Sequence, residues 1–191
     1  FAREPSIEYY DELRHVLGRA YFELGDHFNA LLHLEHAIDA QRTVSDADLY
    51  QLAYARYRTG DLSGAAEDFE RLSLGDDSLA QSAMFYLADC YLNTGRPRAA
   101  ADAFYAASQG EHVDDIAREA TFLHGQLLAD LGEYDRAVDV LTAFLDRWPT
   151  DRHRNTTVRL LGDILVRTRD YPRAIEVIRT YGDDSPQTRT V

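Results

Sequence analysis

The stretch LGRAYFELGDHFNA, from Leu17 to Ala30, contains the pattern that decides the fold. A small residue, Gly18, lies seven residues before Gly25, which Asp26 follows directly. Ala30 lies five residues after Gly25. Apolar residues on both sides of the Gly-Asp pair recur with the period of an α-helix. Gly tolerates the positive φ that ends a helix, and Asp caps the helix that follows. The stretch therefore predicts two helices joined by a tight turn.

The same pattern returns four more times, at intervals of 35 to 37 residues. The turns lie at Gly25, Gly60, Gly95, Gly132 and Arg169, the preceding small residues are Gly18, Ala53, Ala88, Gly125 and Gly162, and the following alanines are Ala30, Ala65, Ala100, Ala137 and Ala174. Such periodicity is the sequence signature of a repeat protein. Large residues at the small positions would force the two helices of a unit apart. We predict five units at about 11–45, 46–80, 81–117, 118–154 and 155–188, with about ten antiparallel helices.

Helix start and stop signals support these units. Ser78 and Gln81 have the spacing of a capping box ahead of the third unit, which predicts that Ser78 caps a helix there. Pro149 follows the fourth unit's second helix and prevents its continuation.

The pattern resembles the tetratricopeptide repeat (TPR), a helix-turn-helix unit of about 34 residues. The resemblance implies an all-α, right-handed α-solenoid of five hairpins over residues 11–188. Four residues depart from the family pattern: Arg56 stands where a Tyr is usual, Arg169 where the turn Gly is usual, and Leu72 and Tyr181 where an Ala is usual. Residues 144–175 are most similar to bacterial envelope proteins of the outer-membrane assembly lipoprotein and Tol-Pal coordinator types. That similarity implies a periplasmic or outer-membrane-associated location, with the cytoplasm as the alternative.

The C-terminal sequence repeats an earlier one. Gly-Asp-Asp-Ser occurs at 75–78, where the third unit begins, and again at 182–185. The last residues are therefore expected to begin a sixth unit, and Phe1 to be the remnant of an earlier one. We expect the 191 residues to be a single repeat array that is a fragment of a longer repeat protein.

Composition excludes several kinds of function. The formal net charge is -13 and every basic residue among the 20 is Arg, which argues against nucleic acid and anionic membranes as partners. No apolar run reaches the roughly 20 residues that span a bilayer. We expect no cofactor and no metal: His33 and His36 are interpreted as part of a solvated helix face, and Cys90 as a core residue. No catalytic motif occurs, so the chain is not expected to be an enzyme. The oligomeric state stays open.

The resemblance implies that the first helix of each unit lines a concave face that binds a partner protein or peptide. The residues expected to bind are Arg19, Phe22, Tyr50, Tyr54, Tyr57, Phe85, Asp89, Phe122, Gln126 and Asp130. Tyr50, Tyr54 and Tyr57 share one helix face, and aromatic residues are common at binding hot spots. The alternative is that these rings pack against each other. The predicted function is a non-catalytic protein-interaction scaffold. The rivals are an accessory recognition domain of a larger envelope enzyme and a peptide or small-molecule sensor.

Overall fold

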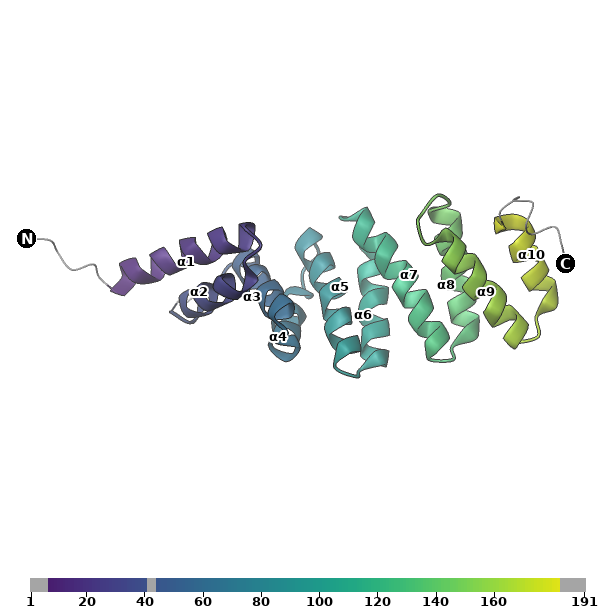
Figure 1. Ribbon diagram of the computed structural model, residues 1–191, viewed down its shortest axis with the longest axis horizontal. Helices are drawn as coiled ribbons and strands as arrows, with labels where there is room; N and C mark the ends of the chain where they lie inside the picture. Colours follow the sequence, from purple (N-terminus) through teal and green to yellow (C-terminus); the bar gives the residue numbers. More distant parts are fainter. Residues whose placement is uncertain (1–6, 41–43, 183–191) are drawn as a thin grey trace, which may run out of the picture. The chain divides into compact units, whose positions relative to one another are not determined.

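The computed structural model describes residues 7–40 and 44–182, and all regular structure in these residues is helical (Figure 1). The chain divides into two compact units, Phe1–Val113 and Asp114–Val191. The first unit holds α1 (Ile7–Glu23), α2 (His27–Ala40), α3 (Asp46–Thr59), α4 (Leu62–Leu72), α5 (Ser78–Asn93) and α6 (Pro97–Gln109). The second holds α7 (Asp114–Asp130), α8 (Tyr134–Arg147), α9 (Arg154–Arg167) and α10 (Tyr171–Tyr181). The predicted all-α fold of ten helices in five hairpins is confirmed for the described residues. That the five repeats form a single array stays a prediction.

Each hairpin turns at the residue that the sequence pattern predicts. The backbone has positive φ at Gly25, Gly60, Gly95, Gly132 and Arg169. In the second hairpin, the N–H of Gly60 donates to the carbonyl of Tyr57 at 3.2 Å, and the N–H of Asp61 donates to that of Arg56 at 3.0 Å. This pair of bonds is a Schellman motif, which satisfies carbonyls at a helix end. The other four turns have the equivalent pair, so Arg169 adopts φ 62° despite its side chain.

Small residues bring the two helices close together in the first and fourth hairpins but not in the last. A Cβ on Gly18 would lie 2.7 Å from Leu34 Cγ, and one on Gly125 would lie 2.5 Å from Leu141 Cδ2. These contacts are far below a van der Waals distance, so no side chain fits. A Cβ on Gly162 would meet no atom within 4 Å. The predicted reason for small residues therefore holds at Gly18 and Gly125 and is wrong at Gly162.

Hairpins stack on one another within each unit. The second helix of one hairpin packs on the first helix of the next, as α2 does on α3, α4 on α5 and α8 on α9. The core of the second unit is built from such contacts and includes the fully buried Leu141, Phe144, Leu161 and Leu165. The repeat alanines are all buried.

The predicted capping box at the start of α5 is wrong. The N-cap is Asp77, whose carboxylate accepts the N–H of Ala80 at 2.8 Å, and Ser78 is the first residue of the helix. Gln81, only 3% exposed, instead holds the loop that follows α6. Its Nε2 donates to the carbonyls of Ala107, Gly110 and Val113, and its Oε1 accepts the N–H groups of His112 and Val113. Gln81 therefore holds a distant loop instead of capping a helix, because an amide side chain can both donate and accept hydrogen bonds.

An ion pair occupies the place of the usual Tyr in the second hairpin. Arg56 donates to Asp68 at 2.7 Å and to Glu35 at 2.7 Å, which ties α3 to both α4 and α2. Asp68 is buried, and this burial raises the pKa of its carboxyl although Arg56 opposes the rise. The residues predicted to begin a sixth unit, 183–191, and Phe1 lie outside the described residues.

Candidate partner-binding surface

The first unit carries a continuous cluster of aromatic side chains on α1, α3 and α5. We call Phe22, Tyr50, Tyr54, Tyr57, Phe85 and Tyr86 the aromatic surface. The three tyrosines of α3 lie in a row, with ring centroids 6.2 Å apart between Tyr50 and Tyr54 and 6.0 Å between Tyr54 and Tyr57. Their i, i+4, i+7 spacing places them on one helix face, as predicted.

Tyr86 lies at the centre of the aromatic surface, although it was not among the predicted residues. Its ring centroid is 5.0 Å from that of Tyr54, 5.3 Å from Tyr57 and 5.8 Å from Phe69. Burial, followed by the neighbouring Tyr54, raises the pKa of Tyr86 to about 12. Its sequence neighbour, Phe85, was predicted to face the partner. Two adjacent aromatic residues in a helix point in different directions. The Phe85-Tyr86 pair in the sequence was therefore the feature that could have identified Tyr86.

The aromatic surface is partly exposed and partly packed on itself. Phe22 meets Tyr54 edge to face at 5.8 Å, and Phe85 meets the fully buried Phe104 at 5.6 Å. All six residues of the surface are intermediate between buried and exposed. The rings thus support each other, as one of the two interpretations of the sequence expects, and their role in binding a partner stays a prediction.

Polar groups at the margin of this surface are already engaged. The hydroxyl of Tyr57 donates to Asp89 at 2.7 Å, and Arg58 donates to the hydroxyl of Tyr54 at 3.1 Å. Burial and the bond to Asp89 raise the pKa of Tyr57. Arg19 lies exposed on α1. Asp89 therefore positions Tyr57 and retains a second oxygen that can accept from a partner.

Phe122 in the second unit is buried, which corrects its predicted role. It is 4% exposed and belongs to the core around Phe144. His153, from the loop between α8 and α9, stacks on its ring with centroids 4.0 Å apart. A partner cannot reach Phe122 while this loop covers it.

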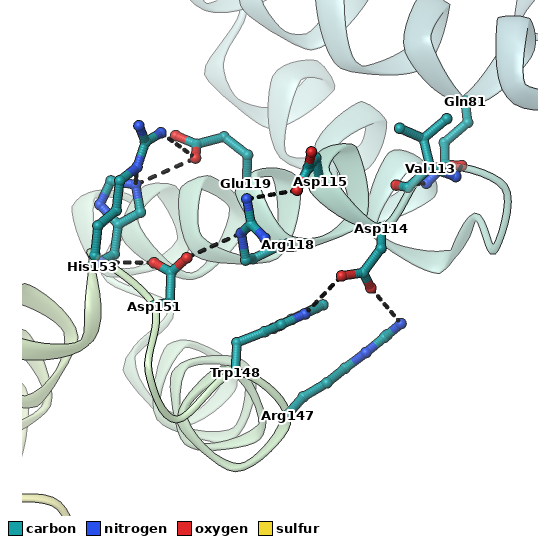
Figure 2. Close-up of polar contacts among 11 residues, drawn as sticks. Gln81, Val113, Asp114, Asp115, Arg118, Glu119, Arg147, Trp148, Asp151 and His153 are labelled. Carbon is teal, nitrogen blue, oxygen red and sulfur yellow. Dashed lines mark hydrogen bonds and ion pairs between the residues drawn. The ribbon is translucent and has the colours of Figure 1, made fainter.

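A set of polar contacts holds that loop against α7 (Figure 2). Glu119 accepts from Arg152 at 2.7 Å, and Arg118 pairs with Asp151 at 3.0 Å. At the start of the helix, Asp114 accepts from the indole N–H of Trp148 at 3.3 Å. The sequence analysis did not predict these contacts. The charged residues just after Pro149 could have indicated them, but their partners on α7 lie 33 or 34 residues earlier in the chain.

The other predicted residues of the second unit lie toward the end of α7. Gln126 is partly exposed and Asp130 is exposed. Asp130 lines a hollow of about 600 Å³ with Asp163, Val166 and Tyr134. Arg167 also borders this hollow and donates to the hydroxyl of Tyr134 at 2.9 Å. Two exposed carboxylates beside apolar surface suit a basic or amphipathic side chain of a partner.

Cysteine, histidine and carboxylate side chains could serve catalysis or metal binding, so their surroundings are described in turn. Cys90 is fully buried, and burial raises the pKa of its thiol to about 12, with the nearby Asp89 adding to the rise, so the thiolate is not formed at neutral pH. Within residues 7–40 and 44–182, no group of three or more His, Cys, Asp or Glu side chains could hold a metal ion. His33 stacks on Tyr21, with ring centroids 5.5 Å apart. In the same ranges, no helix has the length and apolar character needed to cross a membrane.

Stacked helical hairpins with Gly-based turns and an aromatic face define a helical-repeat protein. Family comparison agrees: tetratricopeptide repeat models match residues 6–43, 50–113 and 122–187. The chain belongs to the tetratricopeptide repeat family.

Solved structures with a similar fold include those of MamA proteins. A crystal structure of MamA has a TM-score of 0.71 and 14% identity, with 97% of this chain and 98% of that chain covered. MamA AMB-1 has a TM-score of 0.73 and 18% identity, with coverage of 95% and 97%. At these identities the similarity shows the fold alone. A search of curated proteins finds no match.

Proposed function

We propose that the chain is a non-catalytic interaction scaffold that binds a partner protein or peptide through the first helices of its repeats. The observation that carries this proposal is the aromatic surface of α1, α3 and α5. Partly exposed aromatic rings that are braced by neighbours lose little side-chain entropy on binding, and such residues dominate binding hot spots. Membership of the tetratricopeptide repeat family supports the same function.

The surface suggests what the partner offers. The rings of Tyr54 and Phe85 supply apolar area, and the carboxylates of Asp89 and Asp130 supply negative charge in their respective units. A segment with apolar and basic side chains satisfies both, and the net charge of -13 favours its approach. The proposed partner is therefore a protein or peptide with an amphipathic, basic segment.

The experiment begins with capture of partners from the source cells by the intact protein, with identification by mass spectrometry. The affinity of the purified partner is then measured for the unchanged chain, Tyr54→Ala and Tyr105→Ala. Tyr105 is an exposed tyrosine on α6, outside the aromatic surface, and serves as the matched control. We expect Tyr54→Ala to weaken binding by about tenfold or more, as hot-spot residues do, without unfolding the protein. Equal affinities for all three proteins would remove the aromatic surface from the proposal.

A location at the bacterial envelope is the second part of the proposal. It is supported by the similarity of residues 144–175 to envelope repeat proteins, and the fold does not bear on it. Fractionation of the source cells, followed by immunodetection of the protein, tests it directly. Recovery in the cytoplasmic fraction alone would contradict this part and leave the scaffold function intact.

A further inference from the structure

The hollow of about 600 Å³ in the second unit is lined by residues of α7 and α9 and by the start of α8. Its lining includes Ala129 on α7, together with Leu160 and Asp163 on α9. Ala129 and Leu160 are partly buried, and Asp163 is exposed. The hollow therefore combines apolar side chains with a carboxylate that is open to solvent.

In the first unit, the equivalent place between two first helices is occupied by a ring. Tyr57 on α3 lies three residues before the turn of its hairpin, as Ala129 does on α7. Asp89 on α5 lies six residues before the turn of the next hairpin, as Asp163 does on α9. The hydroxyl of Tyr57 donates to Asp89 at 2.7 Å. The second unit thus has the same carboxylate, but a methyl group stands where the phenol would be.

A second contact of the Tyr57 ring has a counterpart in the hollow as well. The ring centroid of Tyr57 lies 5.3 Å from that of Tyr86. Tyr86 lies nine residues before its turn, as Leu160 does, so Leu160 offers apolar surface at the same place. The two groups that hold the Tyr57 ring in the first unit therefore both have equivalents in the lining of the hollow.

The carboxylate of Asp163 can accept a hydrogen bond from a partner. Among the hydrogen bonds within residues 7–40 and 44–182, none joins another side chain to this carboxylate. Arg167 is close enough to interact with it through charge, but the guanidinium donates to the hydroxyl of Tyr134 at 2.9 Å. A partner's hydroxyl can therefore bond to Asp163 without displacing a side chain of this protein.

We propose that the hollow binds a tyrosine side chain of the partner, in the position that Tyr57 has in the first unit. The inference rests on the proposed function and specifies one side chain of the partner. The ring packs on Leu160, and the phenol hydroxyl donates to Asp163. A hydrogen bond to a charged group is stronger than a neutral one, so the hydroxyl distinguishes tyrosine from phenylalanine. Asp130, which also lines the hollow, suits a basic residue beside that tyrosine.

Titration of the 191-residue chain with N-acetyl-L-tyrosinamide, followed by NMR, tests the proposal. A ligand of this size should bind with a Kd on the order of 1 mM and shift the methyl signals of Ala129 and Leu160. N-acetyl-L-phenylalaninamide lacks the hydroxyl and should bind about tenfold more weakly. N-acetyl-L-lysinamide carries a charge but no ring, and it should also bind more weakly than the tyrosine probe.

Variants of the chain show where the probe binds. Ala129→Tyr supplies the ring from within the chain, so it should abolish binding of the tyrosine probe. Asp163→Ala removes the acceptor and should lower the affinity for the tyrosine probe to that for the phenylalanine probe. Asp163 is exposed, so this variant keeps the test valid if Ala129→Tyr does not fold. Asp102→Ala makes the same exchange at an exposed position of α6 and should leave the affinity unchanged. Circular dichroism checks that each variant is folded.

Any of five results would overturn the proposal. They are the absence of methyl shifts at probe concentrations of about 10 mM, well above the expected Kd, equal affinities for the tyrosine and phenylalanine probes, tighter binding of the lysine probe, unchanged affinity in a folded variant at Ala129 or Asp163, and a loss of affinity in Asp102→Ala. None of these results bears on the partner affinity of Tyr54→Ala, because Tyr54 lies in the first unit. The scaffold function and the tyrosine site can therefore fail separately.

Discussion

Leu141 on α8 lies directly against the backbone of Gly125 on α7: a Cβ at Gly125 would lie 2.5 Å from Cδ2 and 2.7 Å from Cγ of Leu141. Leu141 is fully buried, so its side chain has nowhere to move. Gly162 holds the same repeat position in α9 and has no atom within 4 Å of such a Cβ. Of these two glycines at one repeat position, only Gly125 is thus required for a close approach of the helices.

These two glycines predict opposite effects of one substitution. Gly125→Ala should lower the free energy of unfolding by about 1–3 kcal/mol, because the added methyl overpacks the contact with Leu141. Gly162→Ala should raise it by about 0.5–1 kcal/mol, because Ala is the better helix former and nothing obstructs its methyl. Urea unfolding of the two variants checks both values. A loss of stability in Gly162→Ala would show that α9 and α10 pack more closely than the structure indicates.

The fifth turn predicts a stabilising change. Arg169 adopts φ 62°, where a side chain is strained by about 1 kcal/mol or more, yet it keeps the Schellman bonds of the glycine turns. Arg169→Gly should raise the free energy of unfolding by roughly 0.5–1 kcal/mol, since the relief of strain exceeds the added entropy of the unfolded chain. The reciprocal change, Gly132→Ala at φ 80°, should lower it by a similar amount. Equal stability of both variants and the unchanged chain, measured by thermal unfolding, would contradict the role of φ.

The sequence predicts this fold well because its turns are local. Gly60 and Asp61 specify a helix end and a helix start within two residues, and the backbone at that point adopts the expected conformation. Ala65 predicts close packing in the same way, because small residues are needed wherever helices approach. Gly162 shows the limit of this argument: a small residue permits a close approach but does not enforce it.

The candidate site was predicted less completely because burial depends on residues distant in sequence. The row of Tyr50, Tyr54 and Tyr57 follows from helical spacing alone. The burial of Phe122 does not, since it depends on His153, which lies in a loop 31 positions later. Gln81 is a similar case, because its partners lie 26 to 32 residues away. No local pattern specifies such pairs.

The ion pair of Arg56 and Asp68 predicts strong coupling between two substitutions. Arg56→Leu leaves the buried Asp68 without its main partner and should cost about 2 kcal/mol or more. Later hairpins carry apolar side chains at both places, Leu128 and Leu165 for Arg56, and Val140 and Val177 for Asp68. The double variant Arg56→Leu/Asp68→Val should therefore recover most or all of the lost stability. A double-mutant cycle from urea unfolding measures the coupling. Simple additivity of the two single losses would show that the pair contributes nothing.

Tyr86 predicts a loss of stability at alkaline pH. Burial and the neighbouring Tyr54 raise the pKa of Tyr86 to about 12, whereas an unfolded tyrosine ionises near about 10. Because the folded pKa is the higher one, the contribution of the neutral phenol is complete below about pH 10 and declines as the pH rises toward about 12. The urea midpoint should fall over this interval, since unfolding then releases a proton.

Tyr86→Phe removes this titrating group and keeps the ring, so the ring contacts with Tyr54, Tyr57 and Phe69 persist. Its urea midpoint should decline less steeply with pH than that of the unchanged chain. The pH-dependent part of the difference should vanish at about pH 8, where the phenol is neutral in both the folded and the unfolded states. Any difference that remains at this pH comes from loss of the hydroxyl, including its hydrogen bond with Tyr54. Absorbance titration of phenolate provides a second readout: the variant should lose one tyrosine that titrates late. Parallel pH profiles of the two proteins would mean that the hydroxyl of Tyr86 is open to solvent, which would also open the centre of the aromatic surface to a partner.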